Sequence, residues 1–202
     1  MADLALRWNG RDRRVVAFDL AGPETGFPPT DHAAALDLVR RHHLAVTLHA
    51  SEPPGLELIS QSLACGANRI GHGVRLYDDI TVTGDGLKLG PLARYIKNLQ
   101  VHLEMAPSCH VHVGAIESFD RHPLMMWHRA GFNVGVNTDN RLMSGVSVSS
   151  EFERLAVNFD MTLGEMQSLT RAAINAGFGD FDERQEILFR LIEPGFDTAA
   201  TA

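Results

Sequence analysis

The segment of residues 45–52 constrains the fold of this chain more than any other. It begins with apolar residues of the kind that a buried strand accepts, whereas His49 and Glu52 are costly to bury without a specific role. Two prolines follow and end the strand, and residues 55–65 have the apolar spacing of a helix. Parallel α/β enzymes carry their functional groups at such strand ends. Taken alone, the segment fits equally well a structural histidine beside an exposed glutamate.

Strands and helices alternate along the rest of the chain. Strands are predicted at residues 15–20, 45–49, 69–73, 100–105 and 133–139. Helices are predicted at residues 31–43, 55–65, 89–97, 123–129, 149–159, 162–176 and 181–192, with a further helical segment ending near residue 8, a polar insertion at 78–86 and a frayed tail at 197–202. The strands recur roughly every 25 to 35 residues, which is typical of the βα units of a parallel sheet.

The length of the chain limits how much of a barrel it can form. The 202 residues are 45% hydrophobic and 21% charged, which predicts a single domain over residues 1–202. A closed (β/α)8 barrel typically needs about 250 residues and eight strands, but only five strand segments occur in this sequence. The expected fold is therefore α/β, an incomplete (β/α)8 barrel of about five βα units.

Charge and cysteine content restrict the partners and the compartment. The net charge of −7 disfavours nucleic acid and anionic membranes as partners. No apolar run reaches the ~18 residues of a membrane span, and the first residues lack the pattern of a signal peptide. Cys65 and Cys109 form no CxxC pair, which agrees with a reducing cytoplasm. A cytoplasmic protein acting on a small molecule is expected, and its oligomeric state stays open.

Polar residues gather where the predicted strands end. Right-handed crossovers place the carboxyl ends of all parallel strands on one side of the sheet. The polar groups and the loop glycine expected there are Asp19, Gly22, His49, Glu52, His72, Glu104 and Asp139.

These residue types suit a catalytic zinc site. His49 and Asp139 carry the nitrogen and oxygen ligands that zinc accepts, and such a site keeps one position open for water. Glu52 is placed to hold or donate a proton, and His72 to orient or deprotonate the water. Each residue also has a structural alternative, since a glycine-flanked histidine is often part of a turn and Asp139 with Asn140 can cap one.

Four ordered segments resemble the motifs of the adenosine deaminases. They are residues 19–24 (DLAGPE), 49–52 (HASE), 69–73 (RIGHG) and 136–140 (VNTDN). The resemblance extends from residue 15 to about residue 196, and residues 139–144 look like the bacterial, actinobacterial-type branch. It implies a zinc-dependent barrel enzyme that hydrolyses a purine nucleoside, adenosine or 2′-deoxyadenosine, to inosine or its deoxy form and ammonia, in purine salvage.

The resemblance also assigns roles to individual residues. It makes His49 and Asp139 zinc ligands, Glu52 the proton donor to purine N1, and His72 the residue that positions the attacking hydroxide. Gly22 matches a loop glycine whose backbone contacts the substrate. In addition, Asn140 stands where many members have an aspartate facing purine N7.

The chain departs from the family pattern in several places. The family's His-x-His pair on the first barrel strand has no counterpart here, so the sequence resembles only a C-terminal portion, without two zinc ligands and about three strands. Ser51 replaces the usual glycine, and residues 106 and 109–112 differ from the usual polar sequence. His110 and His112 are not expected to replace the missing pair, because they are predicted to lie in a loop.

Two other functions remain open from the sequence. One is adenine deaminase or a related purine aminohydrolase, since these enzymes share the zinc chemistry and the motifs. The other is an inactive, truncated remnant of the family. Substrate screening separates the first from adenosine deaminase, and a His-x-His upstream in the reading frame argues against the second.

Overall fold

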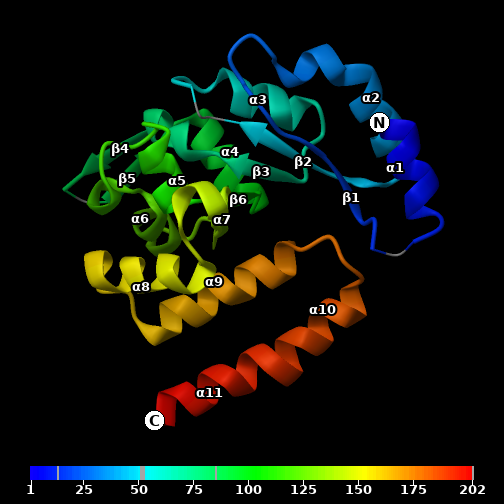
Figure 1. Cartoon of the computed structure of the whole chain (residues 1–202). Helices are drawn as coiled ribbons and strands as arrows, with labels where there is room; N and C mark the ends of the chain where they lie inside the picture. Colours follow the sequence, from blue (N-terminus) through cyan, green and yellow to red (C-terminus); the bar gives the residue numbers. More distant parts are fainter. Residues whose placement is uncertain (13, 51–52, 85, 202) are drawn as a thin grey trace. The chain divides into compact units, whose positions relative to one another are not determined.

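The computed structural model describes residues 1–12, 14–50, 53–84 and 86–201. The chain divides into two compact units, Met1–Glu104 and Met105–Ala202, and each is described by itself. Figure 1 shows the elements of both units in chain order. The single domain expected from the sequence stays a prediction.

A parallel sheet forms the centre of the first unit. Its strands, in spatial order, are β1 (Ala17–Leu20), β2 (Ala45–Ala50), β3 (Arg69–His72) and β6 (His102–Met105). The register aligns Asp19 with Thr47, and Thr47 with Arg69, so these polar side chains share one face. All four strands lie within or close to the predicted ranges, which confirms the parallel α/β prediction for this unit.

The opposite face of the sheet carries the hydrophobic core. The helices of this unit are α1 (Ala2–Asn9), η1 (Pro29–His32), α2 (Ala33–Arg41), α3 (Glu57–Ala64), η2 (Val74–Asp79) and α4 (Pro91–Leu99). Val46 and Leu48 of β2 are buried with Leu36 and Val39 of α2 in one cluster. The pleat of β2 therefore sends alternate residues into this core and toward the polar face.

The segment predicted as a polar insertion contains a hairpin. Its strands β4 (Ile80–Thr83) and β5 (Gly86–Leu89) pair antiparallel. The short run of β-branched residues in β4 favours extended backbone, a signal too brief to separate from a loop by periodicity. Asp79 fixes the start of the hairpin to α4, because its Oδ2 accepts a 2.8 Å hydrogen bond from the Ala93 N–H.

The second unit is mainly helical. Its elements are α5 (Pro107–His112), η3 (Phe119–Arg121), α6 (Leu124–Arg129), β7 (Val134–Val136), α7 (Arg141–Ser144), α8 (Val148–Phe159), α9 (Leu163–Ala176), α10 (Phe181–Ile187), the π-helical turn η4 (Leu188–Ile192) and α11 (Glu193–Thr201). The Asn137 N–H after β7 donates a 2.8 Å hydrogen bond to the Met105 carbonyl at the end of β6. Strand β7 lies within the range 133–139 and is the fifth of the predicted strands.

Residues 197–201 of the tail predicted to be frayed are helical instead, and Ala202 lies outside the described residues. Helix α11 continues from α10 through the π-helical turn, as the orange and red ribbon of Figure 1 shows. Pro194 has no N–H to donate within a helix, and a π turn that ends two residues before it accommodates this defect. Glu193 at the start of α11 pairs with Arg171 of α9, so contacts outside the tail stabilise it.

No helix among the residues that the structure describes is long and apolar enough to cross a membrane.

Two stacked histidines are buried in the second unit. His110 is fully buried and His122 is 2% exposed, and their rings stack with His110 Nδ1 2.8 Å from His122 Nε2. His122 Nδ1 accepts a 3.2 Å hydrogen bond from the Leu124 N–H. The ring is therefore neutral with its proton on Nε2, and burial lowers the pKa of His122 to about 3.

This low pKa predicts a loss of stability in acid. Below the ordinary histidine pKa of about 6.5 the unfolded chain binds a proton that the native His122 does not bind until about pH 3. The free energy of unfolding should then fall by up to about 1.4 kcal/mol per pH unit between pH 6.5 and 3. Urea unfolding at several pH values measures this change in the free energy of unfolding.

The variant His122→Asn is matched to this prediction, because its Oδ1 can still accept from the Leu124 N–H but does not protonate. This variant should reduce the pH dependence of the free energy of unfolding. His42→Gln, at an exposed helix end, should leave that dependence unchanged. An equal slope in the parent chain and His122→Asn would contradict the prediction.

Candidate active site

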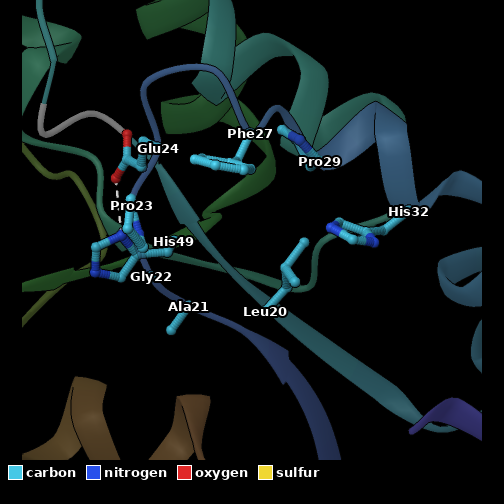
Figure 2. Close-up of a pocket in the computed structure, with 9 residues that line it drawn as sticks. All are labelled: Leu20, Ala21, Gly22, Pro23, Glu24, Phe27, Pro29, His32 and His49. Carbon is cyan, nitrogen blue, oxygen red and sulfur yellow. Dashed lines mark hydrogen bonds and ion pairs between the residues drawn. The ribbon is translucent and has the colours of Figure 1, made fainter.

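His49 lies near the carboxyl end of β2 with its side chain 18% exposed. Its Nδ1 is 2.8 Å from Oε1 of Glu24, whose side chain is only 4% exposed. Figure 2 shows this pair as a dashed line between the loop after β1 and the strand β2. A carboxylate accepts the Nδ1 proton of a neutral imidazole, which leaves the Nε2 lone pair available.

Glu24 was not predicted as a site residue. It belongs to the segment 19–24 that resembles the family, but nothing in the sequence shows that its carboxylate reaches His49, 25 residues later. A glutamate directly after a Gly-Pro loop is usually exposed. The sequence therefore did not indicate that Glu24 is buried.

His72 is brought against His49, as the prediction of a shared site requires. It is the last residue of β3 and 3% exposed, and its Nε2 contacts the Nε2 of His49. The two rings lie edge to face, with centroids 4.0 Å apart and planes at 84°. A Cβ on Gly71 would lie 3.2 Å from the Cα of His49, so a glycine permits this close approach of β3 to β2.

The backbone of His72 is in the left-handed region, with φ 66°. This conformation is uncommon for a residue with a side chain and costs of order 1 kcal/mol, so surrounding contacts must fix it. Such positions occur often at functional sites. The backbone of His72 thus departs from the extended conformation of a strand, and its side chain is held in one specific orientation.

Gly22 lies in the loop after β1 with φ 134°, a conformation that favours glycine. The loop borders a cavity of about 230 Å³ that Figure 2 displays. The cavity is lined by Leu20, Ala21, Gly22, Pro23, Glu24, Phe27, Pro29, His32 and His49. Gly22 and His49 therefore face one cavity, in agreement with the prediction that they share a site.

Further polar side chains lie on the same face of the sheet as His49. Glu104 accepts a 2.9 Å hydrogen bond from Thr47 Oγ1 and forms an ion pair with Arg69 at 2.7 Å. Burial raises the pKa of the Asp19 carboxyl, and the negative charge of Glu104 raises it further. Asp19 and Glu104 were expected on this face, and the register places them there.

Asp139 and Asn140 belong to the second unit. Asp139 follows β7 with φ 49°, and its Oδ2 is 2.8 Å from Cys109 Sγ and 3.5 Å from Asn140 Nδ2. The structure brings these two predicted residues together with Cys109. His49 and His72 belong to the first unit. The predicted catalytic residue Glu52 lies outside the described residues.

The prediction that residues 109–112 form a loop is wrong, because these residues form the end of helix α5. Residues two apart on a helix point in different directions. His110 stacks on His122, while His112 Nδ1 lies 3.1 Å from Ser144 Oγ. That they do not form a replacement metal pair stays a prediction.

The donor set fits zinc in kind but not in number. Within the part of the chain that the structure describes, no three His, Cys, Asp or Glu side chains converge as a metal site. His49 and Asp139 nevertheless carry an imidazole and a carboxylate. Each of these groups is hydrogen-bonded by a second side chain, Glu24 and Cys109 respectively. Metal ligands are usually oriented in this way.

Comparison with known proteins identifies relatives of the chain. It is 46% identical over 198 residues to adenosine deaminase 1 from Streptomyces coelicolor, a match covering 97% of this chain and 50% of that protein. The chain spans about half the length of the curated relatives it matches.

Solved structures share the fold. An adenine deaminase from Arthrobacter aurescens has a TM-score of 0.79 at 22% identity, covering 100% of this chain and 58% of that one. An amidohydrolase from Burkhoderia ambifaria with bound zinc has a TM-score of 0.79 at 20% identity, covering 99% and 54%. These likenesses confirm the predicted partial α/β barrel.

The sequence profile described as adenosine deaminase matches residues 1–194, nearly the whole chain. Its motifs, its fold and its relatives at 43–46% identity agree. The chain therefore belongs to the adenosine deaminase family.

Proposed function

We propose that this chain serves the zinc-dependent hydrolytic deamination of adenosine and 2′-deoxyadenosine to inosine or 2′-deoxyinosine and ammonia, in purine salvage. The observation that carries the proposal is the arrangement of Glu24, His49 and His72, in which a buried carboxylate fixes one imidazole against another at a cavity. The free cysteines Cys65 and Cys109 agree with a reducing, cytoplasmic location.

The metal would be held by His49 and Asp139. A bound zinc supplies Lewis-acid activation of water at neutral pH. A catalytic zinc takes three protein ligands or more, so these two residues need partners. We assign the partners to the His-x-His pair that the family resemblance implies, outside the 202 residues.

The chain's own residues supply the proton transfers. Glu52 donates a proton to N1 of the purine, which makes C6 more electrophilic. His72 accepts a proton from the attacking water and orients it toward C6. The backbone of Gly22 contacts the substrate beside the cavity, and the Asn140 amide faces N7.

Adenine deamination is the second candidate. The observation in its favour is the structural likeness to the Arthrobacter aurescens adenine deaminase, at 22% identity. The 46% identity to a Streptomyces coelicolor adenosine deaminase favours the nucleoside. An inactive remnant is the third alternative, and the same assay tests it.

The test compares the chain alone with the chain mixed with a separately expressed fragment that bears the His-x-His pair. The chain alone is expected to be inactive and to associate through the edge strands β1 and β7, because it supplies too few ligands and barrel strands. The mixture should release ammonia from adenosine and 2′-deoxyadenosine faster than from adenine.

Two results would contradict parts of the proposal. Preference for adenine would support the second candidate. A purified monomer of the chain alone that binds one zinc tightly and converts adenosine would disprove the assignment of the other ligands to a separate segment.

Replacing Glu52 tests its role as proton donor. Glu52→Gln should reduce turnover in the reconstituted enzyme by at least ~10²-fold, the usual size of a general acid–base contribution. Zinc content should stay near that of the parent, because Glu52 is not assigned as a ligand. Unchanged kcat with zinc verified would remove Glu52 from the mechanism.

Replacing Glu24 tests the orientation of His49. Glu24→Gln keeps the size of the side chain but removes the carboxylate charge that holds the Nδ1 proton. It should weaken zinc binding in the reconstituted enzyme by roughly 10- to 100-fold, as loss of an outer-shell partner does. Chelator competition measures the affinity, with the exposed Glu117→Gln as control. Equal affinities in all three proteins would show that Glu24 does not support the ligand.

A further inference from the structure

Cys109 is a buried cysteine to which the proposed mechanism assigns no role. It is 2% exposed in helix α5, and its Sγ is 2.8 Å from Asp139 Oδ2. A thiol can donate a hydrogen bond and a carboxylate can only accept one, so the thiol is the donor. The contact joins residues 30 positions apart in sequence and therefore fixes the end of β7 to α5.

Helix α5 is itself held from several sides. The Ser108 N–H donates a 3.1 Å hydrogen bond to the fully buried Glu151, and Arg154 donates one of 2.5 Å to Ser108 Oγ. Two residues after Ser108, His110 stacks on His122. Because these partners come from α8 and from the segment before α6, α5 presents Cys109 in a fixed position.

The carboxylate of Asp139 is bonded on one oxygen. Oδ2 receives both the Cys109 thiol and, at 3.5 Å, the Asn140 amide. Among the described residues, the hydrogen bonds of the Asp139 side chain all involve Oδ2 and leave Oδ1 for another partner. The backbone of Asp139 is in the left-handed region, an uncommon conformation that surrounding contacts must stabilise.

We infer that Cys109 is a positioning residue for Asp139. Its thiol binds Oδ2 and thereby orients Oδ1 as the metal-binding oxygen. The inference rests on the proposed function, in which Asp139 is a ligand. It explains why a buried cysteine, rather than an apolar residue of similar size, lies beside this carboxylate.

The contact can be measured without metal. The infrared S–H stretch lies in a region free of other protein bands and shifts to lower frequency when the thiol donates a hydrogen bond. In a Cys65→Ser chain only Cys109 contributes to this band, because the sequence has two cysteines. The band should be down-shifted and should move to higher frequency in Cys65→Ser/Asp139→Ala. An identical band in both proteins would overturn the inference.

Zinc affinity tests the consequence of the contact. In the chain reconstituted with the His-x-His fragment, Cys109→Ala should weaken zinc binding by roughly 10- to 100-fold. Cys109→Ser keeps a donor and should restore most of the affinity. Thermal unfolding of the metal-free proteins checks that both variants fold, and Cys65→Ser is the matched control.

The outcomes separate this inference from the proposed function. If Asp139→Ala loses zinc but Cys109→Ala binds it as tightly as the parent, Cys109 does not position the ligand. If Asp139→Ala also binds zinc normally, the assignment of Asp139 as a ligand fails instead. A down-shifted S–H band together with the Ala and Ser affinities in the expected order supports the inference.

Discussion

The pleat of β2 is the constraint on which the rest of the first unit depends. Leu48 points into the core with Leu36 of α2, so its neighbour His49 must face the other side of the sheet. A shift of one residue would bury His49 and expose Leu48, and truncating such a leucine alone costs about 2–5 kcal/mol. The hydrophobic core therefore fixes the direction of the imidazole before any ligand binds.

Orientation of the proposed ligands then depends on side chains from loops and helices. Glu24 bonds the imidazole of His49, and Cys109 bonds the carboxylate of Asp139. Both contacts use the atom of the ligand that would not bind metal, in agreement with the usual arrangement of outer-shell residues. His49 in the first unit and Asp139 in the second each have such a supporting side chain. His72 and Asp139 both have left-handed backbones, a conformational cost that is common at functional sites.

The sequence predicted what depends on local patterns. The apolar run that precedes His49 identified β2, and the glycine-flanked His72 identified the end of β3. Both histidines lie in one site because parallel strands align their ends. Helix α5 was missed because its stability comes from later residues such as Glu151. The roles of Glu24 and Cys109 were missed for the same reason, since each depends on a tertiary contact.

X-ray absorption at the zinc edge of the reconstituted enzyme tests the central claim most directly, that His49 and Asp139 bind the metal while Cys109 only supports it. The account predicts a first shell of nitrogen and oxygen alone at about 2.0–2.2 Å, with imidazole scattering that decreases in His49→Ala. A sulfur ligand at about 2.3 Å, or a spectrum unchanged in His49→Ala, would contradict it.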